Sequence, residues 1–238
     1  MLSDLANAFS FLTILPVSWS RPRTDRAPGY AFSFYPLVGL VIGSLISLVA
    51  AIAIRFVPAD VTAFLTLAAW VALTGGLHLD GFADSCDGLL ATVSPERRLE
   101  IMKDPRAGSW AVVGVALLLL GKWVALRYVS FPMLLLAPVA GRWAMLFAVA
   151  LFPNARPGGI GAYFRTGLGP VQMIVATVIA LAVAIALGWR AIIAMVVSCI
   201  IALLFSMWAA KRLGGGLTGD TYGATCELAE LTCLILLV

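Results

Sequence analysis

Long apolar stretches alternate with short polar connections along the whole chain. Six stretches carry little or no charge, and each has about 20 residues, enough to cross a hydrocarbon core of ~30 Å as an α-helix; they are residues 31–54, 61–79, 107–126, 129–152, 166–189 and 191–210. A seventh candidate, 222–238, is apolar only in its second half, because Glu227 and Glu230 lie in its first half. The pattern predicts an all-α, polytopic integral membrane bundle of about seven transmembrane helices with short interfacial helices.

Composition strengthens this assignment and excludes other classes. Of 238 residues, 62% are hydrophobic and 12% are charged, whereas a soluble domain has about 45–50% apolar and about 25% charged residues. The net charge of +4 comes from scattered basic residues that form no run with interleaved aromatics, so we expect no nucleic-acid partner. The four cysteines show no CxxC spacing, which argues against a disulfide framework or a zinc knuckle.

We expect one integral membrane domain over residues 1–238 with three polar subdivisions. Residues 1–20 contain Asp4 and no basic leader, and we interpret them as an interfacial helix rather than a signal peptide. Residues 80–109 are expected to form a cytoplasmic loop with an acidic motif, followed by a surface helix that begins at Ser94-Pro95-Glu96 and runs through Lys103. Residues 211–230 form a second cytoplasmic acidic motif.

The basic residues set the expected orientation. If the N-terminus is cytoplasmic, eleven basic residues fall on the cytoplasmic side and three on the other. Positive residues favour cytoplasmic loops, so we expect the N-terminus and both acidic motifs to face the cytoplasm. The cytoplasmic set is Arg21, Arg23, Arg26, Arg97, Arg98, Lys103, Arg106, Arg156, Arg165, Lys211 and Arg212; the opposite set is Arg55, Arg127 and Arg190.

The first acidic motif holds Asp80, Asp84 and Asp87 within fourteen residues, 75–88. Their i, i+4, i+7 spacing would place three carboxylates on one face of a helix. Such close like charges persist when a cation neutralises them, and oxygen-only ligands favour Mg²⁺. The alternative is a solvated acidic loop.

The second acidic motif holds Asp220, Glu227 and Glu230 at the entrance to the last apolar stretch. Carboxylates from two helix ends on one side of the membrane could hold one or two metal ions and clamp a phosphoryl group. The alternative is a polar helix start that frays among the lipid headgroups.

Several further polar residues have two interpretations each. Lys103 and Arg106 are suited to grip phosphate oxygens or to anchor lipid headgroups. Lys122 and Arg142 lie inside predicted spans, where a cation needs a partner or a wet cavity. His78 is the only histidine, which excludes a zinc site built on several histidines; it either activates a substrate hydroxyl or pairs with an acid of the neighbouring turn.

Taken together, these motifs resemble those of the cobalamin synthase family, whose members are also called adenosylcobinamide-GDP ribazoletransferases. The resemblance rests on GGLHLDGFADSCDG at 75–88 and GGLTGDTYGATCELAE at 215–230, with supporting segments FLTILPV at 11–17, FYPLVG at 34–39 and EIMKDPRAG at 100–108. It covers the whole chain, and no polar position of the two acidic motifs departs from it.

The resemblance implies a Mg²⁺-dependent step late in cobalamin assembly, in which adenosylcobinamide-GDP is joined to α-ribazole or its 5′-phosphate and GMP is released. It implies a multi-pass protein of a bacterial or archaeal inner membrane whose partners are these two substrates and the lipid bilayer; a homo-oligomer is left open. The expected metal ligands are Asp80, Asp84, Asp87 and Glu227, with Glu230 and Asp220 second. Lys103 and Arg106 would grip the diphosphate, and His78 or a free acid such as Asp80 or Asp84 would take the hydroxyl proton.

Two alternatives stay open at this point. A CDP-alcohol phosphotransferase performs similar chemistry, but its D-x-x-D-G-x-x-A-R motif fails here, because Ala91 and Thr92 stand where its Ala-Arg pair is expected. A membrane transporter would also place ionisable residues inside a bundle, yet most of the acids here gather near one membrane edge.

Overall fold

The computed structural model describes residues 2–17, 27–156 and 158–238. In these residues the regular secondary structure is helical, apart from one isolated bridge between Asn154 and Leu217. The expected fold class is confirmed. The helices are α1 (Leu2–Leu12), η1 (Pro28–Phe34), α2 (Tyr35–Ala53), α3 (Ala59–Thr74), α4 (Leu77–Leu90), α5 (Pro95–Ile101), α6 (Ser109–Leu126), α7 (Phe131–Leu134), α8 (Leu136–Leu151), α9 (Ile160–Arg165), α10 (Pro170–Leu187), α11 (Trp189–Arg212) and α12 (Gly219–Leu236).

Within the described residues, five helical segments are long and apolar enough to cross a membrane: Pro28–Ala53, Ser109–Leu126, Phe131–Leu151, Pro170–Leu187 and Trp189–Arg212. The pair α3 and α4 makes a sixth candidate that is bent by 92°. Helix α12, which matches the seventh expected stretch, is long enough but carries three acids, and most of its side chains are buried inside the bundle. Helix α12 is therefore not among the segments that length, mean hydropathy and charge identify as candidate spans.

The expected continuous span over 61–79 is wrong. Helix α3 ends at Thr74, and α4 starts at Leu77 in a new direction. Gly75 and Gly76 both adopt left-handed backbone conformations, with φ of 61° and 68°, which glycine adopts at little cost. The break also corrects the expected loop at 80–109, because residues 80–90 belong to helix α4, which carries Asp80, Asp84 and Asp87.

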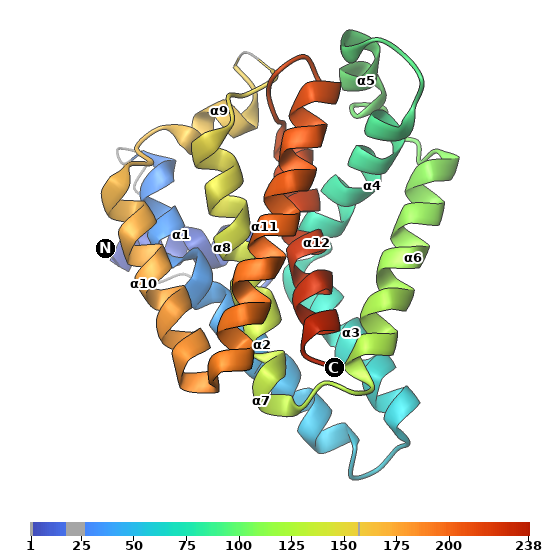
Figure 1. Cartoon of the computed structure of the whole chain (residues 1–238), viewed down its shortest axis with the longest axis vertical. Helices are drawn as coiled ribbons and strands as arrows, with labels where there is room; N and C mark the ends of the chain where they lie inside the picture. The colour runs from blue at the N-terminus through green and yellow to red at the C-terminus, as the bar shows by residue number, and fades with distance from the viewer. Residues whose placement is uncertain (1, 18–26, 157) are drawn as a thin grey trace.

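Helix α12 lies at the centre of the bundle and packs against α4, α8, α11 and α6 (Figure 1). Glycines allow several of these helices to approach closely. A Cβ at Gly81 of α4 would lie 2.8 Å from the backbone of Asp220, and one at Gly141 of α8 would lie 2.6 Å from Glu230. Small residues at helix contacts are typical of membrane bundles, where van der Waals packing holds helices together.

Short helices cap the bundle. Helices α5 and α9 lie at one end, whereas α7 and the turn between α10 and α11 lie at the other (Figure 1). Helix α5 starts as predicted, with the Ser94 hydroxyl accepting a hydrogen bond from the Arg97 amide at 3.4 Å, but it ends at Ile101. The expected interfacial segment 1–20 contains helix α1, whose Ala8 and Leu12 are fully buried in the bundle; residues 18–20 lie outside the described residues.

Candidate active site

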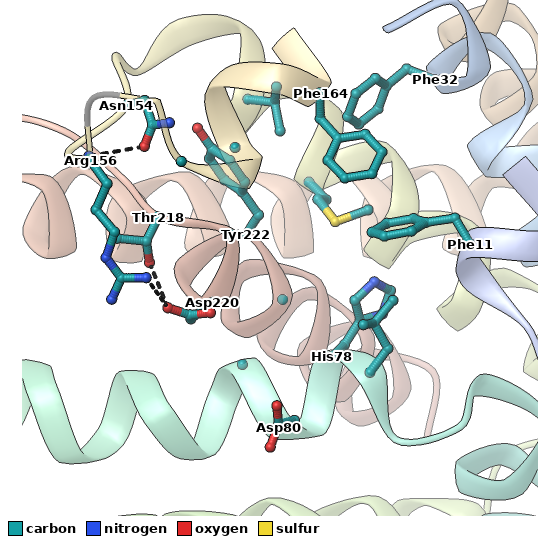
Figure 2. Close-up of a pocket in the computed structure, with 18 of the residues that line it drawn as sticks. Phe11, Phe32, His78, Asp80, Asn154, Arg156, Phe164, Thr218, Asp220 and Tyr222 are labelled. Atoms are coloured by element: carbon teal, nitrogen blue, oxygen red, sulfur yellow. Dashed lines mark hydrogen bonds and ion pairs between the residues drawn. The ribbon is translucent and has the colours of Figure 1, made fainter. Parts of the chain in front are cut away.

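A cavity of about 250 Å³ lies where α4 and α12 meet the N-terminal helix and the segment before α9. Figure 2 shows aromatic rings gathered at one end and polar side chains at the other, with Tyr222 between them and His78 beneath Phe11. The aromatic end is formed by Phe11, Phe32, Tyr35 and Phe164; the polar end by Asp80, Asn154, Arg156, Thr218 and Asp220.

The crossing of α4 and α12 positions the polar side chains. Gly81 contacts the backbone of Asp220, and Gly223 contacts the backbone of His78. Because neither glycine has a side chain, the two helix backbones nearly touch at these points. His78 and Asp80 on α4 are thereby brought beside Asp220 and Tyr222 on α12, although about 140 residues separate them in sequence.

The start of α12 is fixed by its own hydrogen bonds. Thr218 caps the helix and accepts a bond from the Thr221 amide at 3.3 Å, while the Thr218 amide donates to the Thr221 hydroxyl at 2.8 Å. The Leu217 amide donates to Pro153 and the Ala155 amide donates to Leu217, each at 2.8 Å. The segment before α9 is therefore held against the N-terminus of α12.

Arg156 is the cation of this site. Its guanidinium donates to the Asp220 carboxylate at 3.2 Å and to the Leu99 carbonyl at 3.2 Å. Thr218 also donates to the same Asp220 oxygen at 3.2 Å. The Nε atom of Arg156 is buried and has no hydrogen-bond partner among the described residues, so one donor remains available for a ligand.

The first acidic motif forms one side of helix α4, as the spacing predicts. Asp84 is half-buried and lies close enough to Asp220, Asp80 and Asp87 for their charges to repel. Asp80 is exposed and lines both the cavity and a shallower hollow on the α6 side of α4. Three acids of α4 and one of α12 thus share one region of negative potential.

Asp87 already has partners. Its carboxylate accepts hydrogen bonds from the amides of Gly108 at 2.6 Å and Ala111 at 2.9 Å. These amides belong to the first turn of α6 and its N-cap, where a helix has unsatisfied donors and favours negative charge. Asp87 therefore caps α6 and ties it to α4.

Glu227 and Glu230 lie deeper in the bundle and face two cations. Lys122 of α6 donates to Glu227 at 2.6 Å and also to Glu230, and Arg142 of α8 donates to Glu230. All four side chains are buried. Of the two environments expected for the intramembrane cations, a partner or a wet cavity, the structure shows a partner for each. Both glutamates are neutralised by these cations rather than directed at the acids of α4.

The structure does not bring the six expected metal ligands together. Among the residues it describes, no three His, Cys, Asp or Glu side chains converge into a group that could hold a metal ion. Asp80, Asp84 and Asp220 remain near the cavity, whereas Asp87 caps a helix and the two glutamates form ion pairs. The three remaining carboxylates still suit a hard cation that takes few protein ligands.

His78 is 4% exposed, and neither ring nitrogen has a hydrogen-bond partner in the described part of the chain. The expected pairing with an acid of the neighbouring turn is not seen. The Tyr222 hydroxyl and the Asn154 amide nitrogen, which line the same cavity, are also buried and unpaired within those ranges. Buried polar groups normally have partners, so this trio marks a place for a ligand.

Lys103 and Arg106 lie in the loop between α5 and α6 and outside the cavity lining. Arg106 pairs with Asp104 at 2.7 Å, and its side chain is 87% exposed. Hydrogen bonds from Arg106 lower the pKa of Asp104 to about 2. The cation beside the cavity is instead Arg156, which the sequence analysis uses only to predict membrane orientation. A single arginine between two apolar stretches has no neighbouring motif that would indicate a role in a site.

The chain is similar in sequence to known proteins over almost its whole length. A family model described as cobalamin-5-phosphate synthase matches residues 4–238. No solved structure matches the chain significantly.

Curated relatives match over nearly their full length. A protein of Roseiflexus sp. is 39% identical over 98% of this chain and 88% of its own. One of Brevibacillus brevis is 40% identical over 100% of this chain and 98% of its own, and one of Pseudomonas savastanoi is 41% identical over 97% and 96%. All three are named adenosylcobinamide-GDP ribazoletransferase.

Proposed function

Because this chain belongs to the cobalamin-5-phosphate synthase family, we propose that it is an adenosylcobinamide-GDP ribazoletransferase. It is a membrane-embedded enzyme that joins adenosylcobinamide-GDP to α-ribazole or its 5′-phosphate and releases GMP. The match over residues 4–238 carries this conclusion. It also decides against the two alternatives that the sequence left open, a CDP-alcohol phosphotransferase and a transporter.

The reaction is a displacement at phosphorus. A ribose hydroxyl oxygen of the acceptor bonds to the phosphorus that carries cobinamide, the bond from that phosphorus to the GMP oxygen breaks, and the hydroxyl proton passes to a base. Catalysis of such a step depends on positioning and on stabilising negative charge. The site must therefore supply a base, a cation and a rigid place for the acceptor.

Arg156 is our choice for the cation that binds the diphosphate. It lies in the cavity wall, and its buried Nε has no partner among residues 2–17, 27–156 and 158–238. Its bond to Asp220 fixes the planar guanidinium, and a fixed guanidinium is well suited to phosphate oxygens. This assignment replaces Lys103 and Arg106, whose loop does not line the cavity.

Asp80 and Asp84 both lie near the polar end of the cavity, and whichever of the two does not bind the metal ion proposed below is our choice for the proton acceptor. Asp220 has a different role: it holds Arg156 and is itself bonded by Thr218. His78 is buried and lies beside Phe11, away from Arg156 and Asp220 (Figure 2). We assign it to substrate binding rather than to proton transfer.

Mg²⁺ is proposed as the cofactor. Asp80, Asp84 and Asp220 offer only oxygen atoms, and Mg²⁺ usually takes one or two carboxylates together with substrate phosphates. A site with one or two protein carboxylates agrees with the structure, because Asp80, Asp84 and Asp220 lie near one another but do not converge as a group of three. When bound, the ion would neutralise charge on the diphosphate.

We also propose that the end of the bundle with α5, α9 and the start of α12 faces the cytoplasm of a bacterial or archaeal cell. Basic residues gather in the connections at that end, and the positive-inside rule favours the cytoplasm for such loops. The polar end of the cavity would then be accessible from the side of the membrane that contains soluble nucleotides.

The decisive experiment measures GMP release by the purified protein in lipid. Release that requires adenosylcobinamide-GDP, α-ribazole 5′-phosphate and Mg²⁺, and that stops with EDTA, supports the assignment. Asp80→Asn is expected to abolish turnover while expression and membrane insertion stay intact. No GMP release from protein shown to be folded would overturn the proposed function.

A further inference from the structure

We propose that the aromatic end of the cavity binds the base of the acceptor nucleoside, and that His78 and Tyr222 orient this nucleoside toward Arg156. The inference rests on the proposed function and deepens it by assigning one of the two substrates to a place. The ligand class is a nucleoside with a flat, bicyclic aromatic base of low polarity.

The walls of this end are suited to a planar apolar ring. The Phe11 and Phe164 rings lie 4.5 Å apart between centroids, and Phe32 packs edge-on against Phe164 at 6.5 Å. Phe32 also contacts the Tyr35 ring at 4.3 Å. Aromatic side chains bind bases through stacking and edge contacts, without requiring many hydrogen bonds.

The unpaired polar atoms lie where a nucleoside would meet them. His78 lies beside Phe11 at the aromatic end, and the Tyr222 hydroxyl points toward Asn154 (Figure 2). A neutral imidazole has one donor and one acceptor nitrogen. With the base against the phenyl rings, His78 can donate to its ring nitrogen, and Tyr222 and Asn154 can bond the ribose hydroxyls.

Size and polarity narrow the choice of ligand. A volume of about 250 Å³ is just below the range of ~300–1,000 Å³ typical of small-molecule sites, so the cavity suits one nucleoside and not a corrin macrocycle. Guanine presents several donors and acceptors along its edge, and at the aromatic end it would find only the polar groups of His78 and Tyr35 among the lining residues. Burying polar groups without partners is unfavourable, which favours the less polar base of the acceptor.

This placement also orients the reaction. A nucleoside whose base lies against Phe164 and whose ribose passes Tyr222 directs its hydroxyl groups to the end that holds Arg156 and Asp220. The acceptor hydroxyl would then meet the phosphorus beside the cation assigned to the diphosphate. The remaining substrate would approach from the open side of Asp80, which also lines the hollow beyond α4.

Equilibrium dialysis of labelled α-ribazole against the full-length protein in lipid nanodiscs, without adenosylcobinamide-GDP, tests the inference directly. Phe164→Ala is expected to weaken α-ribazole binding roughly tenfold or more through lost stacking, and Tyr222→Phe by roughly 2- to 10-fold through a lost hydrogen bond. The KM for adenosylcobinamide-GDP should change little in both. Phe56→Ala, at an exposed turn outside the cavity, is the matched control.

Three outcomes separate the possibilities. Unchanged α-ribazole binding in Phe164→Ala and Tyr222→Phe, or displacement of α-ribazole by excess GMP alone, overturns the inference even if the wild type releases GMP. Absence of GMP release from the wild type overturns the proposed function, whereas the dialysis still tests the cavity. If Phe164→Ala does not fold, Phe164→Leu and Tyr222→Phe carry the test.

Discussion

At the scale of single residues, four buried charged side chains form one group in the interior of the bundle. Lys122, Arg142, Glu227 and Glu230 balance to zero, and the Lys122 ammonium also lies 4.4 Å from the centre of the Trp70 ring. Isolated charges inside a bilayer are unfavourable, so each member depends on the others. The group joins α6 and α8 to α12 below the proposed active site.

Removing one acid should destabilise the whole protein. Glu230→Gln leaves Lys122 and Arg142 with Glu227 as the only remaining acid, and breaking a buried pair costs about 3–5 kcal/mol. The midpoint of thermal unfolding in lipid should fall clearly. Glu100→Gln, whose ion pair with Arg97 is exposed, is the control and should have an effect within about 0.5 kcal/mol; equal effects of the two changes would contradict the proposed balance.

The choice of cation at the diphosphate can also be tested by substitution. Arg156→Met should lower kcat/KM for GMP release by roughly 10²-fold or more, because a fixed charge in the site is lost. Arg106→Met should have a small effect, since its guanidinium is exposed and paired with Asp104. The reverse result would restore the sequence-based assignment of Arg106. Arg97→Met serves as a control for loss of a surface cation.

At the scale of elements, the contact between α4 and α12 decides whether the site forms. The helices meet at Gly81 and Gly223, and each glycine packs against the backbone of the other helix. The distance between the two helices at this contact therefore determines how far His78 and Asp80 lie from Asp220. A side chain at either glycine would push the helices apart rather than displace a flexible neighbour.

Gly81→Ala should reduce both stability and turnover. Its Cβ would lie 2.8 Å from the Asp220 backbone, and such overpacking costs about 1–3 kcal/mol. Gly219→Ala, where a Cβ meets no atom within 4 Å, is the matched stability control. Thermal unfolding and GMP release of the two variants provide the measurements; an unaffected Gly81→Ala would show that α12 can shift without consequence.

Much of the helical architecture was predictable from the sequence. Apolar length identified the spanning helices, and the spacing of Asp80, Asp84 and Asp87 predicted their shared helix face. The bend at Gly75-Gly76 was missed because an apolar window ignores backbone conformation. The roles of Glu227 and Arg156 depend on helices and loops far apart in sequence, and hydrophobic periodicity contains no information about such pairings.

At the scale of the whole molecule, charge is distributed unequally between the two ends. The segments around α5 and α9 and the C-terminal end of α11 contain eight of the sixteen basic residues, and Arg212 and Arg98 both bond the Leu89 carbonyl there. The opposite end has the turn between α2 and α3, where Phe56 is 80% exposed. This unequal distribution of basic residues predicts which end of the bundle faces the cytoplasm, and that orientation can be tested.

Cysteine labelling in intact spheroplasts checks the orientation. A membrane-impermeant maleimide should modify Phe56→Cys from outside, whereas Arg97→Cys should react only after permeabilisation. Both positions are exposed, so accessibility in the folded protein does not limit the reaction. The parent protein, with its own cysteines, gives the background. Labelling of Arg97→Cys alone from outside would invert the proposed topology.

The buried charge group has a consequence for how the chain is made. Lys122 and Arg142 leave the ribosome before α12, which supplies both of their acidic partners. During synthesis, α6 and α8 must therefore enter the membrane or its insertion machinery with uncompensated cations. Only translation of the last helix completes the neutral core, so a chain stopped before Glu227 would retain two exposed charges and become a substrate for quality-control proteases.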